Sequence, residues 1–150
     1  FSMPERFELK YIDKDGAPKQ PVIIHRTIIG SIQRFVGILI EHFGGAFPFW
    51  LSPEQIWIIP IGAEHKKYAN EIGKILGASE FRFQVKDENE TVSKKIREGE
   101  IQKIPYLLIV GDKEVKAKKI SVRERHKGDI GQMPLKKFLE KITGEIEKKK

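Results

Sequence analysis

The chain has 150 residues, a length that fits one domain or one domain joined to part of another. It contains no cysteine, which excludes disulfides and thiol chemistry and favours a cytoplasmic location. No apolar run reaches membrane-spanning length, since Arg34 and Glu41 interrupt the longest one, and the start shows no signal-peptide pattern. The net charge of +7 suits a polyanion partner such as RNA, although a solvated lysine surface explains it equally well. Because the first residue is Phe, we expect the chain to begin inside a longer protein.

The first 26 residues predict an antiparallel hairpin. Residues 6–12 alternate, with Phe7, Leu9 and Tyr11 on one side, as in a half-buried strand. An Asp- and Gly-rich turn follows at residues 13–16. Residues 21–26 contain a β-branched run and predict the second strand.

Residues 31–43 predict an amphipathic helix. Ser31 is a favourable N-cap, and the Gly44-Gly45 pair ends the pattern because glycine tolerates the left-handed cap conformation. The apolar positions fall on one face of a helix, and they are Ile32, Phe35, Val36, Leu39 and Phe43. An aromatic and proline-rich connector, residues 46–53, comes next, and we place a domain boundary between residues 51 and 52.

The remainder alternates strands with helices. Strands are predicted at residues 55–61, 80–86 and 106–110, and helices at 64–76, from Thr91 to about 102, and from about 134 to the end. This order is a βαβαβ pattern, which forms a parallel sheet core. Two short strands at 114–116 and 119–123 should add an antiparallel edge. The predicted fold class is therefore α/β, with a mixed, mostly parallel five-stranded sheet and three helices, preceded by the hairpin and its helix.

Several motifs in this order resemble one known family. They are His25-Arg26, Gly30-Ser31-x-x-Arg34 opening an apolar helix, Gly44-Gly45, the PFWLSP connector at 48–53, GDKE at 111–114 and VRER at 122–125. The set is similar to the third signature motif and C-terminal domain of class II aminoacyl-tRNA synthetases, and to the threonyl branch most closely. The resemblance implies that residues 1–51 are the end of a catalytic domain and that residues 52–150 are an anticodon-binding domain.

The same resemblance implies an activity for the parent protein. It would be a threonine–tRNA ligase that joins threonine to its tRNA through an adenylate, using ATP with Mg2+, and it would be a homodimer that carries Zn2+. The segment alone should be inactive and should hold no cofactor tightly, because the first two signature motifs are absent from it.

Three residues of the N-terminal part receive roles from the resemblance. Arg34, together with Ser31, would bind ATP and stabilise the pyrophosphate side of adenylate formation. Spacing alone favours a surface arginine at position 34, although a cation in the first turn of a helix opposes the helix dipole unless an anion lies beside it. His25 would be one of three zinc ligands, with the other two upstream of this chain.

Four residues of the C-terminal part would contact the anticodon. They are Asn89 in a loop, Arg97 on a helix, and Glu114 and Arg123 on the closing strands. Such side chains read the edges of unpaired bases. At Glu88 and Lys103 the family usually has arginine, so RNA contacts are in doubt at these two positions.

Two alternative functions remain open. The chain could be a stand-alone, non-catalytic RNA-binding module related to the anticodon domain, although His25 and Arg34 would then have no use. It could also be an α/β domain without a nucleic-acid role. His42, His65 and His126 have no ligand-like spacing, and we predict that they are surface residues.

Overall fold

The computed structural model describes residues 2–149 and divides into two compact units, Phe1–Ile38 and Leu39–Lys150. Each unit is described by itself. The predicted domain boundary between residues 51 and 52 stays a prediction.

The first unit contains a short hairpin. Helix α1 (Ser2–Arg6) precedes β1 (Tyr11–Ile12), which pairs antiparallel with β2 (Pro18–Lys19). Across the turn Lys19 forms ion pairs with Asp13 and Asp15, and these lower the pKa of both carboxyl groups. The hairpin is therefore confirmed, but its strands are shorter than predicted.

Two predicted strand segments of this unit are wrong. The segment predicted at 6–12 begins in a helical turn, and residues 20–27 form no regular secondary structure. A strand needs hydrogen-bonding partners, and a two-stranded hairpin is too small a sheet to hold a further apolar segment. The side chains of Val22 and Ile24 are consequently exposed.

Helix α2 (Ile32–Phe43) is confirmed together with both of its ends. The Ser31 hydroxyl accepts a hydrogen bond from the Arg34 amide at 3.2 Å, and Gly44 and Gly45 have left-handed φ values of 55° and 77°. The apolar face of α2 is mostly exposed, since no residue of the helix is buried.

The second unit is built on a five-stranded mixed sheet. Its strands are β3 (Ile56–Pro60), β4 (Phe83–Val85), β5 (Tyr106–Val110), β6 (Lys119–Glu124) and β7 (Gly128–Pro134), in the order β4-β3-β5-β6-β7. β3 is parallel to β4 and β5, whereas β6 is antiparallel to β5 and to β7. The predicted α/β fold with a parallel core and an antiparallel edge is confirmed.

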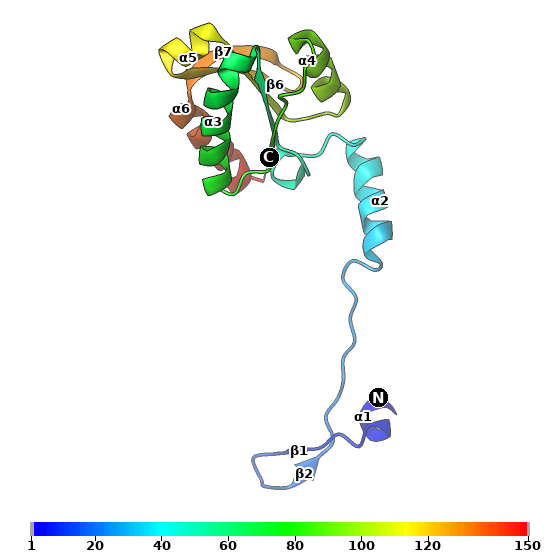
Figure 1. The fold of residues 1–150 in the computed structure, drawn as a ribbon. Helices are drawn as coiled ribbons and strands as arrows, with labels where there is room; N and C mark the ends of the chain where they lie inside the picture. Colours follow the sequence, from blue (N-terminus) through cyan, green and yellow to red (C-terminus); the bar gives the residue numbers. More distant parts are fainter. Residues whose placement is uncertain (1, 150) are drawn as a thin grey trace. The chain divides into compact units, whose positions relative to one another are not determined.

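Helices cover the two faces of the sheet unequally (Figure 1). Short 3-10 turns, Phe49–Leu51 and Ala63–His65, precede β3 and α3, respectively. α3 (Lys66–Ala78) and α6 (Leu135–Glu147) pack on one face through residues such as Ile72 and Phe138. α4 (Val92–Ile101) covers part of the other face through Val92 and Ile96. Across residues 2–149 no helix combines the length and apolarity needed to cross a bilayer.

Two features near the C-terminal edge differ from the prediction. Residues 114–116 lie in a short helix, α5 (Asp112–Ala117), and not in a strand. The partner of β6 is instead β7, which the sequence pattern did not reveal. Glu114 explains the helix, because its side chain accepts a hydrogen bond from the Gly111 amide at 3.0 Å and so caps the first turn.

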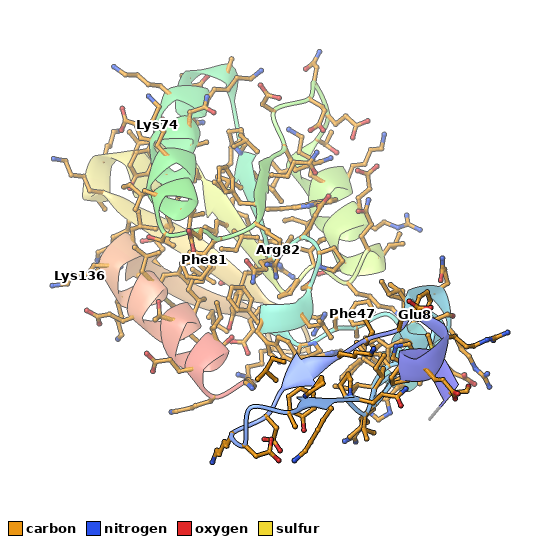
Figure 2. All side chains as sticks on the ribbon, turned by 90° about the horizontal axis from the view of Figure 1, so that it is seen from below. Glu8, Phe47, Lys74, Phe81, Arg82 and Lys136 are labelled. Carbon is orange, nitrogen blue, oxygen red and sulfur yellow. The ribbon has the colours of Figure 1, made fainter. Side chains whose placement is uncertain are left out.

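Two arginines fix the connector, residues 46–53, to the sheet domain. Arg82, labelled in Figure 2, donates to the carbonyl oxygens of Ser52 and Trp50 at 3.0 and 2.9 Å. Arg125 donates to the carbonyl oxygen of Phe47 at 2.6 Å. The ring of Phe49 is buried against the aromatic core, so the connector is held by both packing and hydrogen bonds.

The approach of α4 to the sheet depends on Gly99. A methyl group there would lie 2.6 Å from Leu107 Cδ2 and 3.2 Å from Trp57 Cε3. We therefore predict that Gly99→Ala lowers the free energy of unfolding by about 1–3 kcal/mol through overpacking. The matched control is Gly144→Ala in α6, where nothing lies within 4 Å of the added carbon. This change should raise stability by about 0.5–1 kcal/mol. Urea denaturation of the two variants measures both values, and equal stabilities would contradict the prediction.

Candidate nucleic-acid interface

The sheet face that carries α4 is open beyond that helix. Strand alternation places Leu107 and Ile109 of β5 on this face, and the strand pairing adds Arg123 and Ser121 of β6 and Gln132 of β7. Leu107 is buried beneath α4, but Ile109, Ser121 and Arg123 are half-buried and Gln132 is exposed. We call the surface formed by Ile109, Ser121, Arg123 and Gln132 the open face.

Arg123 lies at the boundary between the open face and α4. Its Nη2 lies 3.4 Å from Glu100 Oε1, a long contact between side chains that are 29% and 58% exposed. Its buried Nε has no hydrogen-bond partner among the described residues. Since buried donors are normally paired, this guanidinium has hydrogen-bonding capacity that the protein itself does not use.

Arg97 borders the same surface. It precedes Glu100 by three residues on α4, and residues at this spacing share one helix face. Its side chain is exposed. Arg97 therefore lies on the same face of α4 as Glu100, the residue that contacts Arg123.

Asn89 lies near the other end of α4. It precedes the N-cap Thr91 and lines a pocket of about 320 Å3 with Lys66 and Lys95. Lys95 is buried, and its ammonium donates to the Lys86 carbonyl at 2.7 Å. Five helical steps from Val92 to Arg97 span about 7.5 Å, and Asn89 lies three residues before the helix begins, so Asn89 is at the edge of the site rather than beside Arg123.

Glu114 approaches the open face from α5. Only 7% of the residue is exposed, and its carboxylate accepts hydrogen bonds from the Gly111 amide and the Gln132 side chain. The second bond joins α5 to the open face. Glu114 therefore has a structural role as a helix cap, in addition to the RNA contact predicted for it.

The two positions that depart from the family pattern are engaged within the protein. Glu88 pairs with Lys86 at 2.9 Å, and this hydrogen bond lowers the pKa of the Glu88 carboxyl group. The Lys103 ammonium donates to the carbonyl oxygen of Gly44. Both side chains thus have partners within the protein.

The residues predicted for ATP and zinc all lie in the first unit. Ser31 and Arg34 begin α2 and are exposed, and His25 is exposed in a segment without regular structure. Residues 2–149 contain no group of three or more His, Cys, Asp or Glu side chains arranged to hold a metal ion. One imidazole does not make a zinc site, so His25 fits zinc only if other ligands come from outside this chain.

The prediction for His65 is wrong, whereas His42 and His126 are exposed as predicted. His65 is 3% exposed; its Nδ1 accepts from the Gly62 amide at 3.0 Å, and its Nε2 lies 3.2 Å from Asp112. The ring thus joins the turn after β3 to the first residue of α5. Sequence reasoning also missed Glu100, although its spacing from Arg97 on a helix could have indicated a shared face.

Comparisons with known proteins show the family to which this chain belongs. The family described as "Anticodon binding domain" matches residues 55–145, so the chain belongs to this family. Two similar curated relatives are the threonine–tRNA ligases of Carboxydothermus hydrogenoformans, 51% identical over the whole chain, and Clostridium tetani, 48% identical over 98% of it. The chain spans 24% and 23% of the lengths of these relatives.

Solved structures give the same result. The RNA-binding domain of threonyl-tRNA synthetase from Cryptosporidium parvum Iowa II superposes with a TM-score of 0.83 at 34% identity, covering 96% of this chain and 37% of that one. A prolyl-tRNA synthetase from C. parvum gives a TM-score of 0.67 at 21% identity, covering 97% of this chain and 31% of that one, which shows a shared fold. The predicted resemblance to the threonyl branch is confirmed.

The hydrogen bonds of Glu114 lead to a stability prediction. Glu114→Ala leaves the Gly111 amide and the Gln132 amide group without their partner, and we expect a loss of about 1–3 kcal/mol in the free energy of unfolding. Glu140→Ala, on the exposed side of α6, is the control and should change stability by less than about 0.5 kcal/mol. Thermal and urea unfolding of both variants test this. Equal unfolding curves would show that the cap contributes nothing.

Proposed function

We propose that this chain is the anticodon-recognition part of a threonine–tRNA ligase, together with the end of its catalytic domain. The parent enzyme would join threonine to threonine tRNA through an adenylate, using ATP with Mg2+ and a Zn2+ ion, and would act as a homodimer in the cytoplasm. The single observation that carries the proposal is the open face, on which the Nε of Arg123 has no partner among the described residues and Gln132 donates to the Glu114 carboxylate. The names of the relatives and the family match support it.

The alternative of a stand-alone RNA-binding module has less support. The family match begins at residue 55, yet the similarity to threonine–tRNA ligases extends over all 150 residues. Residues 1–54 therefore align with the ligases as well, and these residues include His25 and Arg34. We propose that residues 1–51 are part of the catalytic domain and that residues 52–150 form the anticodon-binding domain.

In the proposed anticodon site, each side chain has a chemical task. Arg97 and Arg123 would donate to base edges or phosphates, and Asn89 would both donate and accept. Glu114 would accept from a base once Gln132 releases one of its oxygens. Phosphate contacts would position the RNA loop, whereas contacts to base edges would distinguish its sequence.

In the proposed catalytic part, Arg34 would interact with the ATP phosphates. Its place in the first turn of α2, next to the Ser31 cap, combines a cationic side chain with the positive end of the helix dipole. This is a favourable environment for an anion. His25 would supply one imidazole to the zinc ion, and the remaining ligands would come from the rest of the parent protein.

The anticodon proposal predicts discrimination between RNA sequences. The 150-residue chain should bind a threonine tRNA anticodon stem-loop more tightly than one whose second and third anticodon bases are changed. Arg97→Ala and Arg123→Ala should each reduce this difference by about 1–3 kcal/mol, because a base-reading contact is lost. Fluorescence anisotropy at two salt concentrations separates this effect from general electrostatic attraction, which falls steeply with salt.

Lys136→Ala provides the control for the RNA measurement. Lys136 points outward from α6, on the covered side of the sheet (Figure 2), so its loss should weaken both stem-loops equally and only slightly. If neither arginine variant changes the ratio of the two affinities, the open face does not read the anticodon.

The catalytic proposal predicts an effect of Arg34 in the full-length parent. Arg34→Ala should slow adenylate formation on the order of 100-fold, because a preorganised charge beside the phosphates is lost. Binding of tRNA should stay nearly unchanged. ATP–pyrophosphate exchange measures the first quantity, with the neighbouring Gln33→Ala as the control. Exchange within threefold of the wild-type rate would rule out this role for Arg34.

A further inference from the structure

Two basic residues hold the end of α2 and the start of the connector. The Arg125 guanidinium donates to the Phe47 carbonyl oxygen at 2.6 Å and to the Lys103 carbonyl oxygen at 2.7 Å. The Lys103 ammonium in turn donates to the carbonyl oxygen of Gly44. All four residues belong to the unit that begins at Leu39. We call Lys103 and Arg125 the clamp.

The clamp acts on α2 itself, because the turn at Gly44 is an extension of the helix. The Gly45 amide donates to the Ile40 carbonyl oxygen at 3.1 Å, and the Ala46 amide donates to the Phe43 carbonyl oxygen at 2.9 Å. These bonds close the last turn of α2 in the manner of a glycine cap. An ammonium at this end also interacts favourably with the helix dipole. A bond to the Gly44 carbonyl oxygen therefore holds the helix, and not only the segment that follows it.

Apolar packing supports this end of α2 only in part. A pocket of about 580 Å3 lies beside the clamp, and its lining includes Phe43, Ala46, Lys103 and Arg125. Side chains that border a hollow lack the packing contacts that a filled core would provide. The described part of the chain buries no residue of α2. The direction of the helix therefore depends on the hydrogen bonds of the clamp more than on packing.

The other end of α2 carries Arg34. Because α2 is one continuous helix, Arg34 and Gly44 are about 15 Å apart along its axis. A tilt of about 10° at the Gly44 end would move Arg34 by about 2–3 Å. Misplacement of a group at a reacting centre by about 1 Å can cost on the order of 100-fold in rate. A small change at the clamp is thus sufficient to alter the reaction at Arg34.

We infer that Arg125, together with Lys103, is a positioning residue for adenylate formation. The inference rests on the proposed function of Arg34 in the parent enzyme. The clamp fixes the direction of α2, and α2 places the Arg34 guanidinium beside the ATP phosphates. Lys103, where the family usually has arginine, thereby receives a role within the protein.

The test compares two arginines that each donate to two backbone carbonyl oxygens. Arg125→Met removes the bonds of the clamp and keeps an unbranched side chain. Arg82→Met is the matched control, because Arg82 holds Trp50 and Ser52, beyond the buried Phe49. ATP–pyrophosphate exchange is measured in the full-length parent without tRNA, so an RNA contact of either arginine cannot affect the result. Arg125→Met should slow exchange about tenfold, whereas Arg82→Met should change it by less than about twofold.

A double-mutant cycle shows whether Arg125 acts through Arg34. If α2 transmits the effect, Arg125→Met should change exchange by less than about twofold in a parent that already carries Arg34→Ala. A general loss of folded enzyme would instead lower the rate by the same factor in both backgrounds. The cycle therefore separates positioning of Arg34 from stabilisation of the fold.

Three outcomes would overturn the inference. Arg125→Met could exchange at the wild-type rate, Arg82→Met could be slowed as much as Arg125→Met, or the effect of Arg125→Met could be unchanged in the Arg34→Ala background. Failure of the proposed function gives a different result. In that case the wild-type parent shows no threonine-dependent exchange, or Arg34→Ala itself exchanges at close to the wild-type rate, and this inference fails with it.

Discussion

The parallel pairing of β3 with β5 is the constraint on which the rest of this domain depends. β3 is buried on both faces, and β5 is buried on one face and, at Leu107, beneath α4 on the other, so their register is fixed by two separate sets of apolar contacts. The register of β5 in turn sets the register of β6, its antiparallel neighbour. A shift of one residue would turn Arg123 away from the open face and into the core beneath α3 and α6, where a charged group is costly. The position of the candidate site is thus a consequence of core packing.

A second constraint acts on the connector. Arg82 and Arg125 hold the connector through its backbone carbonyl oxygens, which any sequence would provide. Phe49, in contrast, holds it through the packing of its aromatic ring against Tyr106. Burial lowers the pKa of Arg125, as expected for a guanidinium inside the protein. Arg125 lines a pocket of about 580 Å3 together with Ala46 of the connector, but its guanidinium is already bonded to two backbone carbonyl oxygens.

The sequence predicted the elements whose signals are local. The β5 run, the Thr91 cap of α4 and the Gly pair after α2 all act within a few residues, and each is found where predicted. β7 was missed because Gly128 and Gly131 interrupt a largely polar segment that only its pairing with β6 makes regular. The strand predicted at 114–116 failed because Glu114 and Gly111 form a short capped helix. Arg123 and Glu114 border the same sheet face from different ends of β5, and their contacts with Glu100 and Gln132, respectively, join residues distant in sequence, so no local pattern could predict these contacts.

Net charge alone could not show which basic residues are functional, because the chain has 28 of them. The contacts of the arginines divide them into those that hold the fold together and one that is available to a ligand. Arg82 and Arg125 make short hydrogen bonds, between 2.6 and 3.0 Å, to the backbone of the connector. Arg123 makes one long contact to an exposed carboxylate, and such exposed pairs contribute little to stability. A ligand can therefore replace Glu100 at low cost, whereas replacing the partners of Arg125 would release the connector. The arginine suited to RNA recognition is therefore distinguished by hydrogen-bonding capacity that the protein does not use. Positive charge alone does not separate it from the arginines that maintain the fold.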